Sequence, residues 1–330
     1  MKLFLSIIVP VFNVEKYIRP CIESILKQGI DEKLFEIIIV NDGTKDKSLE
    51  MISDIIANHS NITIINQDNQ GVSVARNKGI ALARGEYVII PDSDDLLFEL
   101  SLNPLLDIAL NTGADLVVAD FIQMSDEEIL KTDNFSSKQK PLPIKIQETT
   151  GHELYTNYLD FNNCAMWHIL FKRDFLVKND LSFLPNTYFE DLLFTPESYL
   201  KANKCIKVSW NLYIYRRRAD SVSLGCFSKK KAESLCVLIN KNWELQAIMN
   251  SQELVEKSIY YITQLIQILL YSLSHSEIRY KDRKHLLNSI RQIINAIYSL
   301  EFSNKLLKKF FIRTMPVFYT YIRHYIGKSW

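Results

Sequence analysis

Three aspartates, Asp92, Asp94 and Asp95, lie within four positions of one another and directly follow the apolar run 87–90. Ionised carboxylates this close together repel one another and raise each other's pKa unless a cation or hydrogen-bond donors hold them. Mg²⁺ and Mn²⁺ are divalent cations that prefer such hard oxygen ligands. The cluster therefore predicts a metal site that could hold the diphosphate of a bound nucleotide. The alternative is a solvated turn or a helix N-cap, where Asp-x-Asp also occurs.

Apolar, β-branched runs alternate with helical patterns before this cluster. The predicted strands lie in residues 5–13, 35–40, 62–65 and 87–90, and a helical pattern follows each of the first three. Strands that are apolar on both faces and alternate with helices indicate an α/β fold with a mostly parallel sheet between helix layers. Ligands of such sheets bind beyond the carboxyl ends of the strands. Asp42 and the aspartate cluster both follow strand ends, so we expect them at the same ligand-binding edge of the sheet.

Five segments carry a family resemblance by their order and spacing. They are Ser6–Asn13 (SIIVPVFN), Val40–Thr44 (VNDGT), Asn69–Asn77 (NQGVSVARN), Gly85–Tyr87 (GEY) and Asp92–Asp95 (DSDD). Together they resemble family 2 glycosyltransferases of the GT-A fold, whereas any one of them alone would be a weak signal. The resemblance continues through Met166–Arg173 and Phe189–Asp191 to Tyr215–Arg218.

The resemblance implies inverting transfer of a sugar from a nucleotide diphosphate donor, expected to be a UDP-sugar, to a hydroxyl acceptor. Asp42 would read the nucleobase and Asp92 the ribose side. Asp94 would hold Mn²⁺ or Mg²⁺, and Asp191 would be the general base. The remaining residues implied in nucleotide binding are Pro10, Val11, Asn13, Arg76 and Ser93.

The reaction itself favours these residue types. A metal held by Asp94 can neutralise the negative charge that builds on the departing diphosphate. The acceptor hydroxyl must lose its proton while it attacks from the opposite face, and a carboxylate base there contributes roughly 10²–10⁴-fold. A single displacement of this kind inverts the anomeric centre. The alternative for Asp191, which precedes a helical apolar stretch, is helix capping with a favourable dipole interaction.

Other side chains are candidates with open alternatives. Arg216 and Arg218 share one face of a strand end, where guanidinium groups could bind diphosphate oxygens or stand in solvent. Arg76 could support Asp92 or the nucleotide, or lie at the surface. The resemblance implies acceptor contacts at Trp167 and His168, and Glu190 is a further candidate for such a contact or for the base. The family often carries Trp-Asn-Lys where this chain has Trp-His-Ile, and His168 alone is more typical of a packed histidine than of a catalyst.

Length and pattern predict two domains. Residues 1–225 would form the catalytic domain, with a nucleotide-binding part over 1–120 and an acceptor part over 121–225, and residues 226–330 a helical domain. The polar segment 125–148 is expected to be an exposed excursion. The last segment, 306–330, mixes cations with aromatic side chains, which is typical of a helix on an anionic membrane surface. The alternative is a helix that packs on the catalytic domain.

Composition restricts partners and location. A formal net charge of +1 gives no overall electrostatic reason to bind nucleic acid. Five scattered cysteines without a C-x-x-C pair favour a reducing cytoplasm. The apolar run after Lys2 lacks a signal-peptide cleavage site and is interpreted as a strand. Since no apolar stretch of about 18 residues occurs, we expect a cytoplasmic protein, peripheral at the inner face of the cell membrane.

The sequence therefore predicts a non-processive, metal-assisted transferase that adds one sugar to a glycan or lipid-linked acceptor in surface polysaccharide synthesis. The alternative is a non-catalytic relative that binds nucleotide or membrane and organises a glycan-assembly complex. The intact acidic set favours catalysis, because a binding-only relative has no chemical need for a base. Nucleotidyl transfer is disfavoured, since no Gly-rich phosphate loop follows the first strand. The chain also lacks the Gln-x-x-Arg-Trp motif of processive synthases.

Overall fold

The computed structural model describes residues 2–132, 135, 139, 143–161, 163–218 and 226–299. The chain divides into two compact units. The first unit comprises residues 1–151, 165–186 and 201–223, and the second unit comprises 152–164, 187–200 and 224–330. The sequence suggested one boundary at residue 225, whereas 152–164 and 187–200 group with the C-terminal helices. The functional division into nucleotide and acceptor parts stays a prediction.

The first unit is built on one sheet. Its described strands are β1 (Leu5–Val11), β2 (Phe35–Asn41), β3 (Ile62–Asn66), β4 (Tyr87–Ile89), β5 (Leu96–Leu97), β6 (Leu116–Ser125), β7 (Lys145–Thr149), β8 (Ile169–Lys172) and β9 (Cys205–Arg217). They follow the order β3-β2-β1-β4-β8-β6-β9-β5, and β7 pairs with β9. Strands β1 to β4 pair in parallel, and β8 is antiparallel to both β4 and β6. The predicted α/β fold with a mostly parallel sheet is confirmed.

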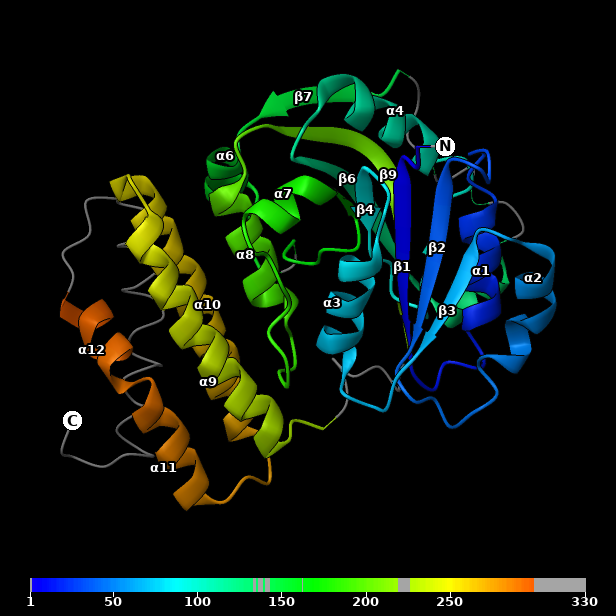
Figure 1. Cartoon of the computed structure of the whole chain (residues 1–330). Helices are drawn as coiled ribbons and strands as arrows, with labels where there is room; N and C mark the ends of the chain where they lie inside the picture. The colour runs from blue at the N-terminus through cyan, green and yellow to red at the C-terminus, as the bar shows by residue number, and fades with distance from the viewer. Residues whose placement is uncertain are drawn as a thin grey trace. The chain divides into compact units, whose positions relative to one another are not determined.

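Helices cover both faces of the parallel strands. They are α1 (Ile18–Leu26), α2 (Ser53–Asn58, after a 3₁₀ turn at Glu50–Ile52) and α3 (Val72–Leu82). The other helices assigned to this unit are α4 (Leu102–Thr112), α5 (Asp126–Leu130) and α7 (Arg173–Lys178). Because crossovers between parallel strands are right-handed, α1 and α2 lie on one face of β1–β3 and α3 lies on the other (Figure 1). Every residue of β1 and β2 is buried between these layers. Gly85 allows the close approach of β4 to β1, since a Cβ there would lie 2.4 Å from the backbone carbon of Leu5.

The strand order reverses at β1. The chain moves from β1 outward to β2 and β3, then returns across β1 to form β4 on its other side. Strand β4 pairs in parallel with β1 over residues 5–7, so the loops that follow β1 and β4 lie at the same edge of the sheet. A switch point of this kind is where open α/β sheets bind their ligands.

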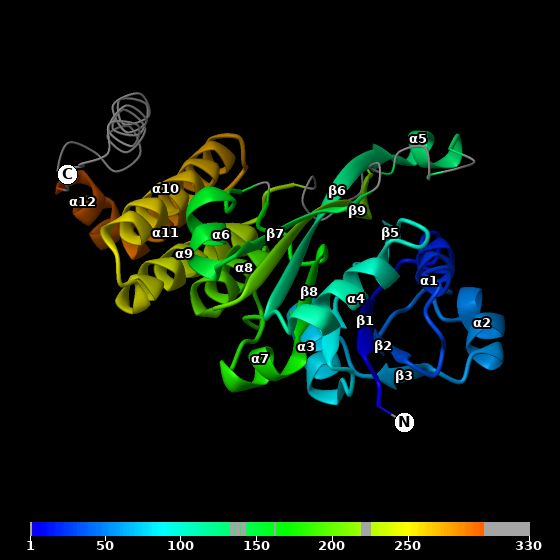
Figure 2. The same ribbon diagram turned by 90° about the horizontal axis from the view of Figure 1, so that it is seen from above.

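Strands β6 and β9 form a long parallel pair. Their register runs from Leu116 opposite Cys205 to Ser125 opposite Arg217, with an irregularity between Val118 and Phe121. The pair extends beyond the neighbouring strands and carries α5 at its end (Figure 2). The predicted excursion at 125–148 is therefore partly regular structure: α5 begins in a capping box at Ser125, and β7 adds to the edge of β9.

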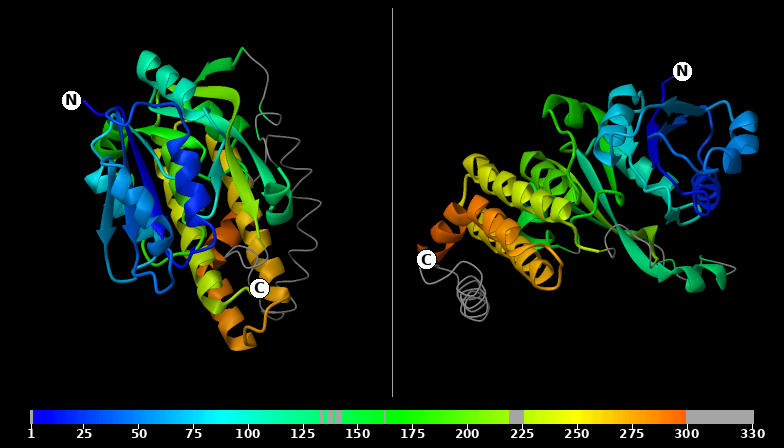
Figure 3. Two further views of the ribbon diagram at one scale, coloured as in Figure 1. Left: turned by 90° about the vertical axis from the view of Figure 1, so that its right-hand side faces the viewer. Right: turned by 90° about the horizontal axis from the view of Figure 1, so that it is seen from below.

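The second unit is helical in its described part, as predicted for the C-terminal region. It contains α6 (Gly151–Asn157), α8 (Asp191–Lys201), α9 (Lys229–Glu244), a 3₁₀ turn at Leu245–Ile248, α10 (Gln252–Ser274), α11 (Tyr280–Ser289) and α12 (Arg291–Ser299). Ser228 and Ser251 cap α9 and α10 by accepting backbone N–H groups. Figure 3 shows α9, α10 and α11, coloured yellow to orange, side by side. Segment 306–330, on which the membrane prediction rests, lies outside the described residues.

Two further features bear on function. Among the described helices, none is both long and apolar enough to cross a bilayer. All five cysteines are free thiols, and four of them are buried while Cys226 is exposed.

Candidate functional site

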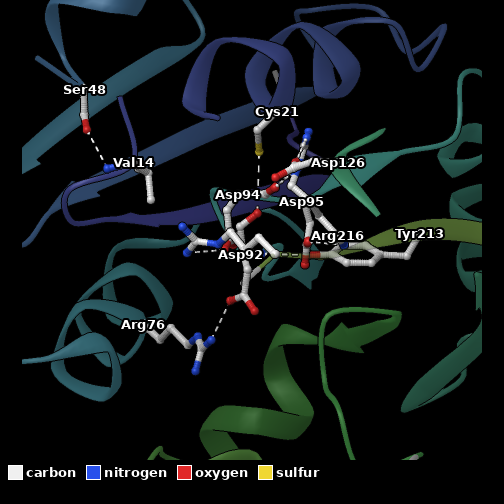
Figure 4. A network of polar contacts seen from close by, with 11 residues as sticks. Val14, Cys21, Ser48, Arg76, Asp92, Asp94, Asp95, Asp126, Tyr213 and Arg216 are labelled. Carbon is white, nitrogen blue, oxygen red and sulfur yellow. Dashed lines mark hydrogen bonds and ion pairs between the residues drawn. The ribbon is translucent and has the colours of Figure 1, made fainter. Parts of the chain in front are cut away.

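The loop that follows β4, Asp92–Asp95, is called the acidic loop below, and its first and third residues each pair with an arginine (Figure 4). Nη2 of Arg76 donates to Oδ1 of Asp92 at 2.6 Å. Nη2 of Arg218 lies 2.6 Å from Oδ2 of Asp94. The Arg76 side chain is only 5% exposed, so it lies beneath Asp92 and supports it, which is one of the roles that the sequence left open. Nucleotide contact by Arg76 stays a prediction.

Asp95 faces the interior instead. Its Oδ2 accepts a hydrogen bond from the Tyr213 hydroxyl at 2.8 Å, and its Oδ1 accepts one from the Arg216 N–H at 2.7 Å. The same tyrosine hydroxyl accepts from the N–H of Asp92 at 2.9 Å. Burial, with the nearby charges of Asp94 and Asp92, raises the pKa of Asp95 well above its usual range. Asp95 therefore anchors the acidic loop to β9, a role that the run of aspartates alone did not reveal.

Arg216 is largely engaged by the protein. Its Nε donates to the Asp94 carbonyl oxygen and its Nη1 to Oδ1 of Asp126, both at 2.7 Å. The ring of Tyr17, at the start of α1, lies 5.0 Å from the guanidinium carbon of Arg216 and 4.8 Å from that of Arg218. Both guanidinium groups therefore contact the same ring, as expected for residues on one face of the strand. This cation–π contact adds to their ion pairs with aspartates. Diphosphate binding by either arginine stays a prediction.

Asp94 is the acidic-loop carboxylate that best fits a divalent cation. Burial and the neighbouring Asp92 raise the pKa of Asp94, and Arg218 only partly offsets this, so additional positive charge at the carboxylate is favourable. No group of three or more Asp, Glu, His or Cys side chains in the described part of the chain could hold a metal. Mg²⁺ is commonly bound by one or two carboxylates together with substrate phosphates. The residues thus fit a cation that also takes phosphate oxygens of a ligand.

A second polar network joins the loops after β1 and β2. Asn13, in a left-handed conformation with φ +52°, donates its N–H to Oγ1 of Thr44 at 2.7 Å. The N–H of Val14 donates to Oγ of Ser48 at 2.9 Å. Burial would raise the pKa of Asp46, but hydrogen bonds from the Ser48 and Thr44 hydroxyls and from the backbone N–H groups of Glu15 and Ser48 lower it overall. Sequence reasoning missed Asp46 and Ser48, although the unbroken run of polar side chains over residues 44–48 was a usable signal.

Asp42 organises the loop that enters α3. Its Oδ1 accepts from Nε2 of Gln67 and from the N–H of Gln70, both at 2.8 Å. Its Oδ2 accepts from the N–H of Gly71 at 2.9 Å, and Gly71 has φ +90°, a conformation that favours glycine. Asp42 thereby fixes the conformation of the loop between β3 and α3. Its role in reading the nucleobase stays a prediction.

The other residues predicted to contact the nucleotide lie at the same edge of the sheet. Pro10 and Val11 are the last residues of β1, and the Val11 carbonyl oxygen accepts from the Asp42 N–H at 2.9 Å. Ser93 is buried within the acidic loop. The structure thus brings together, in the first unit, the residues that the sequence placed at strand ends.

Trp167 and His168 belong to an aromatic cluster that also contains Phe121 and Tyr213. Trp167 stacks on Tyr213 with ring centroids 4.1 Å apart and packs edge-on against Phe121. His168 is fully buried, and its Nδ1 donates to the Ala119 carbonyl oxygen at 2.7 Å. Burial lowers the pKa of His168 to about 4, which keeps the ring neutral. These are the contacts of a packed histidine, and an acceptor contact by Trp167 or His168 stays a prediction.

Glu190 and Asp191 belong to the second unit, where Asp191 is the first residue of α8. Phe189, just before them, has a left-handed φ of +63°. Glu190 is buried, 9% exposed. The predicted base, Asp191, therefore belongs to the second unit, whereas the acidic loop belongs to the first unit. The catalytic role of Asp191 stays a prediction.

Comparison with known proteins identifies the family. Residues 6–171 match the family model described as glycosyl transferase family 2. The uncharacterized glycosyltransferase EpsJ of Bacillus subtilis is 32% identical over 220 residues, which are 66% of this chain and 62% of that protein. The cholesterol galactosyltransferase of Borreliella burgdorferi is 27% identical over 325 residues, 94% of this chain and 88% of that protein.

Solved structures agree on the fold. The crystal structure of S. aureus TarS 1–349 in complex with UDP-GlcNAc has a TM-score of 0.66 and 21% identity, and the match covers 89% of this chain and 82% of that one. This likeness confirms the predicted GT-A fold. The family model spans β1 to β8, including the acidic loop and the loops around Asp42, and the chain therefore belongs to the family 2 glycosyltransferases.

Proposed function

We propose that the protein transfers a single sugar from a UDP-sugar to a hydroxyl group, with inversion at the anomeric carbon. The observation that carries the proposal is the acidic loop at the switch point of the sheet, where the Asp94 carboxylate and the Arg218 guanidinium lie side by side. An anionic diphosphate needs positive charge at this place, and Arg218 together with a cation on Asp94 supplies it. The UDP-GlcNAc and UDP complexes of TarS support the choice of donor.

Each residue has a distinct part in the proposed reaction. A divalent cation, when bound, neutralises the charge that develops on the leaving diphosphate. Asp94 holds that cation, while Arg76 and Tyr213 keep the acidic loop in the required conformation. Asp191 takes the proton of the acceptor hydroxyl as that oxygen attacks.

The proposed acceptor is a glycan or a lipid-linked saccharide at the inner face of the cell membrane, in surface polysaccharide synthesis. The Borreliella relative, whose name gives cholesterol as its acceptor, aligns over 94% of this chain, and this supports a lipid acceptor. The proposed membrane contact rests on segment 306–330, outside the described residues.

Calorimetric titration tests the donor site. UDP, GDP and dTDP are titrated into wild type and Asp94→Asn, in Mn²⁺ and in EDTA, with the exposed Asp107→Asn of α4 as the matched control. We expect UDP to bind most tightly, only in the presence of Mn²⁺, and much more weakly to Asp94→Asn than to Asp107→Asn. Equal UDP affinity in Mn²⁺ and in EDTA would rule out the metal on Asp94.

Turnover with the best-binding donor tests the base. Asp191→Asn is expected to leave donor affinity nearly unchanged and to lower kcat by roughly 10²-fold or more, the range for loss of a general base. If activity survives within a few-fold, the base is elsewhere and Glu190→Gln is the next variant. If wild type binds UDP but transfers no sugar to any acceptor offered, the scaffold alternative is favoured.

A further inference from the structure

Helix α8, which begins at the proposed base, contains Pro196 in its interior. Proline has no N–H, so the helical hydrogen bond from residue 196 to the carbonyl oxygen of Leu192 cannot form. Leu192 follows Asp191 directly and is only 2% exposed. A buried carbonyl without a donor is costly, and the first turn of α8 therefore needs hydrogen bonds from outside the helix.

Two side chains from the C-terminal helices supply these bonds. Nδ2 of Asn242, on α9, donates to the Leu192 carbonyl oxygen at 3.0 Å. The hydroxyl of Tyr261, on α10, donates to the same oxygen at 3.1 Å. Asn242 is 1% exposed and Tyr261 is fully buried, so both bonds are shielded from water. All three residues belong to the second unit.

The residues just before α8 also hydrogen-bond to helix α9. The N–H of Tyr188 donates to Oγ of Ser234, on α9, at 3.0 Å. Between this bond and Leu192 lies Phe189, whose left-handed conformation is unusual for an aromatic residue and persists only where the surroundings enforce it. Asp191 directly precedes Leu192, whose carbonyl oxygen accepts the Tyr261 hydrogen bond, and its negative charge adds to burial and Cys164 in raising the pKa of Tyr261.

We propose that Asn242 and Tyr261 are positioning residues for Asp191, and that α9 and α10 fix the base by clamping the carbonyl that Pro196 leaves without its helical donor. The inference rests on the proposed role of Asp191 as the base. Neither side chain needs to touch substrate. Their effect passes through the backbone of the first turn of α8 to the neighbouring carboxylate.

The test is a double-mutant cycle with Pro196→Ala. Tyr261→Phe and Asn242→Leu are made in the wild type and in the Pro196→Ala variant, where the restored N–H at residue 196 can donate to Leu192. In the wild-type background, kcat is expected to fall by roughly 10- to 100-fold, since displacement of a reacting group by about 1 Å can cost on the order of 10²-fold. UDP affinity and donor KM should stay within about twofold, because the change acts on the base and not on uniform donor binding. In the Pro196→Ala background most of the loss in kcat should disappear.

Two neighbours provide matched controls. Asn240 is also on α9 and its Nδ2 donates to the Cys236 carbonyl oxygen at 2.8 Å, the same four-residue spacing that Asn242 uses with Leu238. Asn240→Leu and Tyr260→Phe are expected to leave kcat unchanged. Hydrogen exchange of the amides of residues 191–195 should accelerate in Tyr261→Phe and not in Tyr260→Phe.

Wild-type kcat and unchanged amide exchange in Tyr261→Phe would overturn the clamp, and so would a loss that Pro196→Ala fails to reduce. The exchange experiment needs no turnover. If Asp191→Asn is fully active while Tyr261→Phe still accelerates exchange, the clamp exists and it is the assignment of the base that fails. Should Asn242→Leu not fold, the cycle with Tyr261→Phe decides alone.

Discussion

The aspartates of the acidic loop differ because each has a different partner. Asp95 is fully enclosed and held by a tyrosine hydroxyl and a backbone N–H, which do not neutralise its charge. Asp92 and Asp94 face arginines. Burial raises the pKa of both Asp94 and Asp95, but only Asp94 keeps enough exposure, 22% of its side chain, to meet a ligand. Partner and exposure, and not residue type, distinguish the buried Asp95 from Asp94, the proposed cation ligand.

The lowered pKa of His168 predicts how the stability of the fold depends on pH. The folded-state pKa is about 4, below the value of about 6.5 for an unperturbed histidine. Between these values the unfolded chain binds more protons, so the stabilising contribution is complete above about pH 6.5 and is lost as the pH falls toward 4. The loss amounts to at most about 3–4 kcal/mol, since the two pKa values differ by about 2.5 units and each unit corresponds to roughly 1.4 kcal/mol.

Urea denaturation at several pH values between 4.5 and 7.5, on wild type and His168→Asn, measures this contribution. An asparagine amide can still donate to the Ala119 carbonyl oxygen but does not titrate. The difference in unfolding free energy between the two proteins should shrink or reverse as the pH falls. Two parallel stability curves would show that His168 titrates normally in the folded state.

Strand β9 is the element that connects the parts of the site. It pairs with β6 and β5, and it carries Tyr213 and Arg216 to the acidic loop. The Tyr213 hydroxyl bonds to two of the loop residues while its ring stacks on Trp167. One strand thus sets both the conformation of the acidic loop and the packing of the aromatic cluster.

Tyr213→Phe should therefore affect both stability and donor binding. It leaves Oδ2 of Asp95 and the N–H of Asp92 without their partner, and a buried polar group in that state costs about 1–3 kcal/mol. We expect unfolding free energy to fall by an amount of that order and UDP affinity in Mn²⁺ to weaken. Tyr87→Phe is the control, because the Tyr87 hydroxyl is equally buried but bonds to the Ala109 and Ala114 carbonyls. Equal UDP affinity for the two variants would separate Tyr213 from the donor site.

Local signals predicted some of these elements and not others. Continuous β-branched runs predicted β1 to β3, because a strand buried on both faces has no polar alternation. The Asp126 that binds Arg216 comes from a segment interpreted as an exposed excursion, since its polar residues gave no sign that α5 approaches β9. Likewise, nothing near Pro196 predicted that donors to Leu192 come from α9 and α10. Partners that are distant in the chain depend on tertiary packing, which spacing does not encode.

The second compact unit of the molecule is assembled from three separate segments of the chain. Segments 152–164 and 187–200 leave the first unit to join the C-terminal helices, so the helical unit contains the proposed base as well as α9 to α12. Under the proposed function, the helical unit therefore contributes to catalysis through Asp191.

Membrane attachment is a separate prediction for the whole chain. Segment 306–330 carries several Lys and Arg residues, and each is worth about 1 kcal/mol near an anionic surface. Flotation with anionic vesicles should recover the intact protein at low salt and release it at high salt. A variant that lacks residues 306–330 should stay unbound while it retains UDP affinity. Failure of the intact protein to bind at low salt would contradict the prediction.

The distribution of buried and exposed cysteines allows the native chain to be labelled at a single site. Cys226 is exposed, whereas Cys21, Cys164, Cys205 and Cys236 are buried, and burial raises the pKa of the Cys21 and Cys164 thiols well above the usual range. A maleimide spin label or fluorophore should therefore attach at one position without any engineered mutation. That position lies two residues before Ser228, the N-cap of α9, so a probe there reports on the helical unit by spectroscopy.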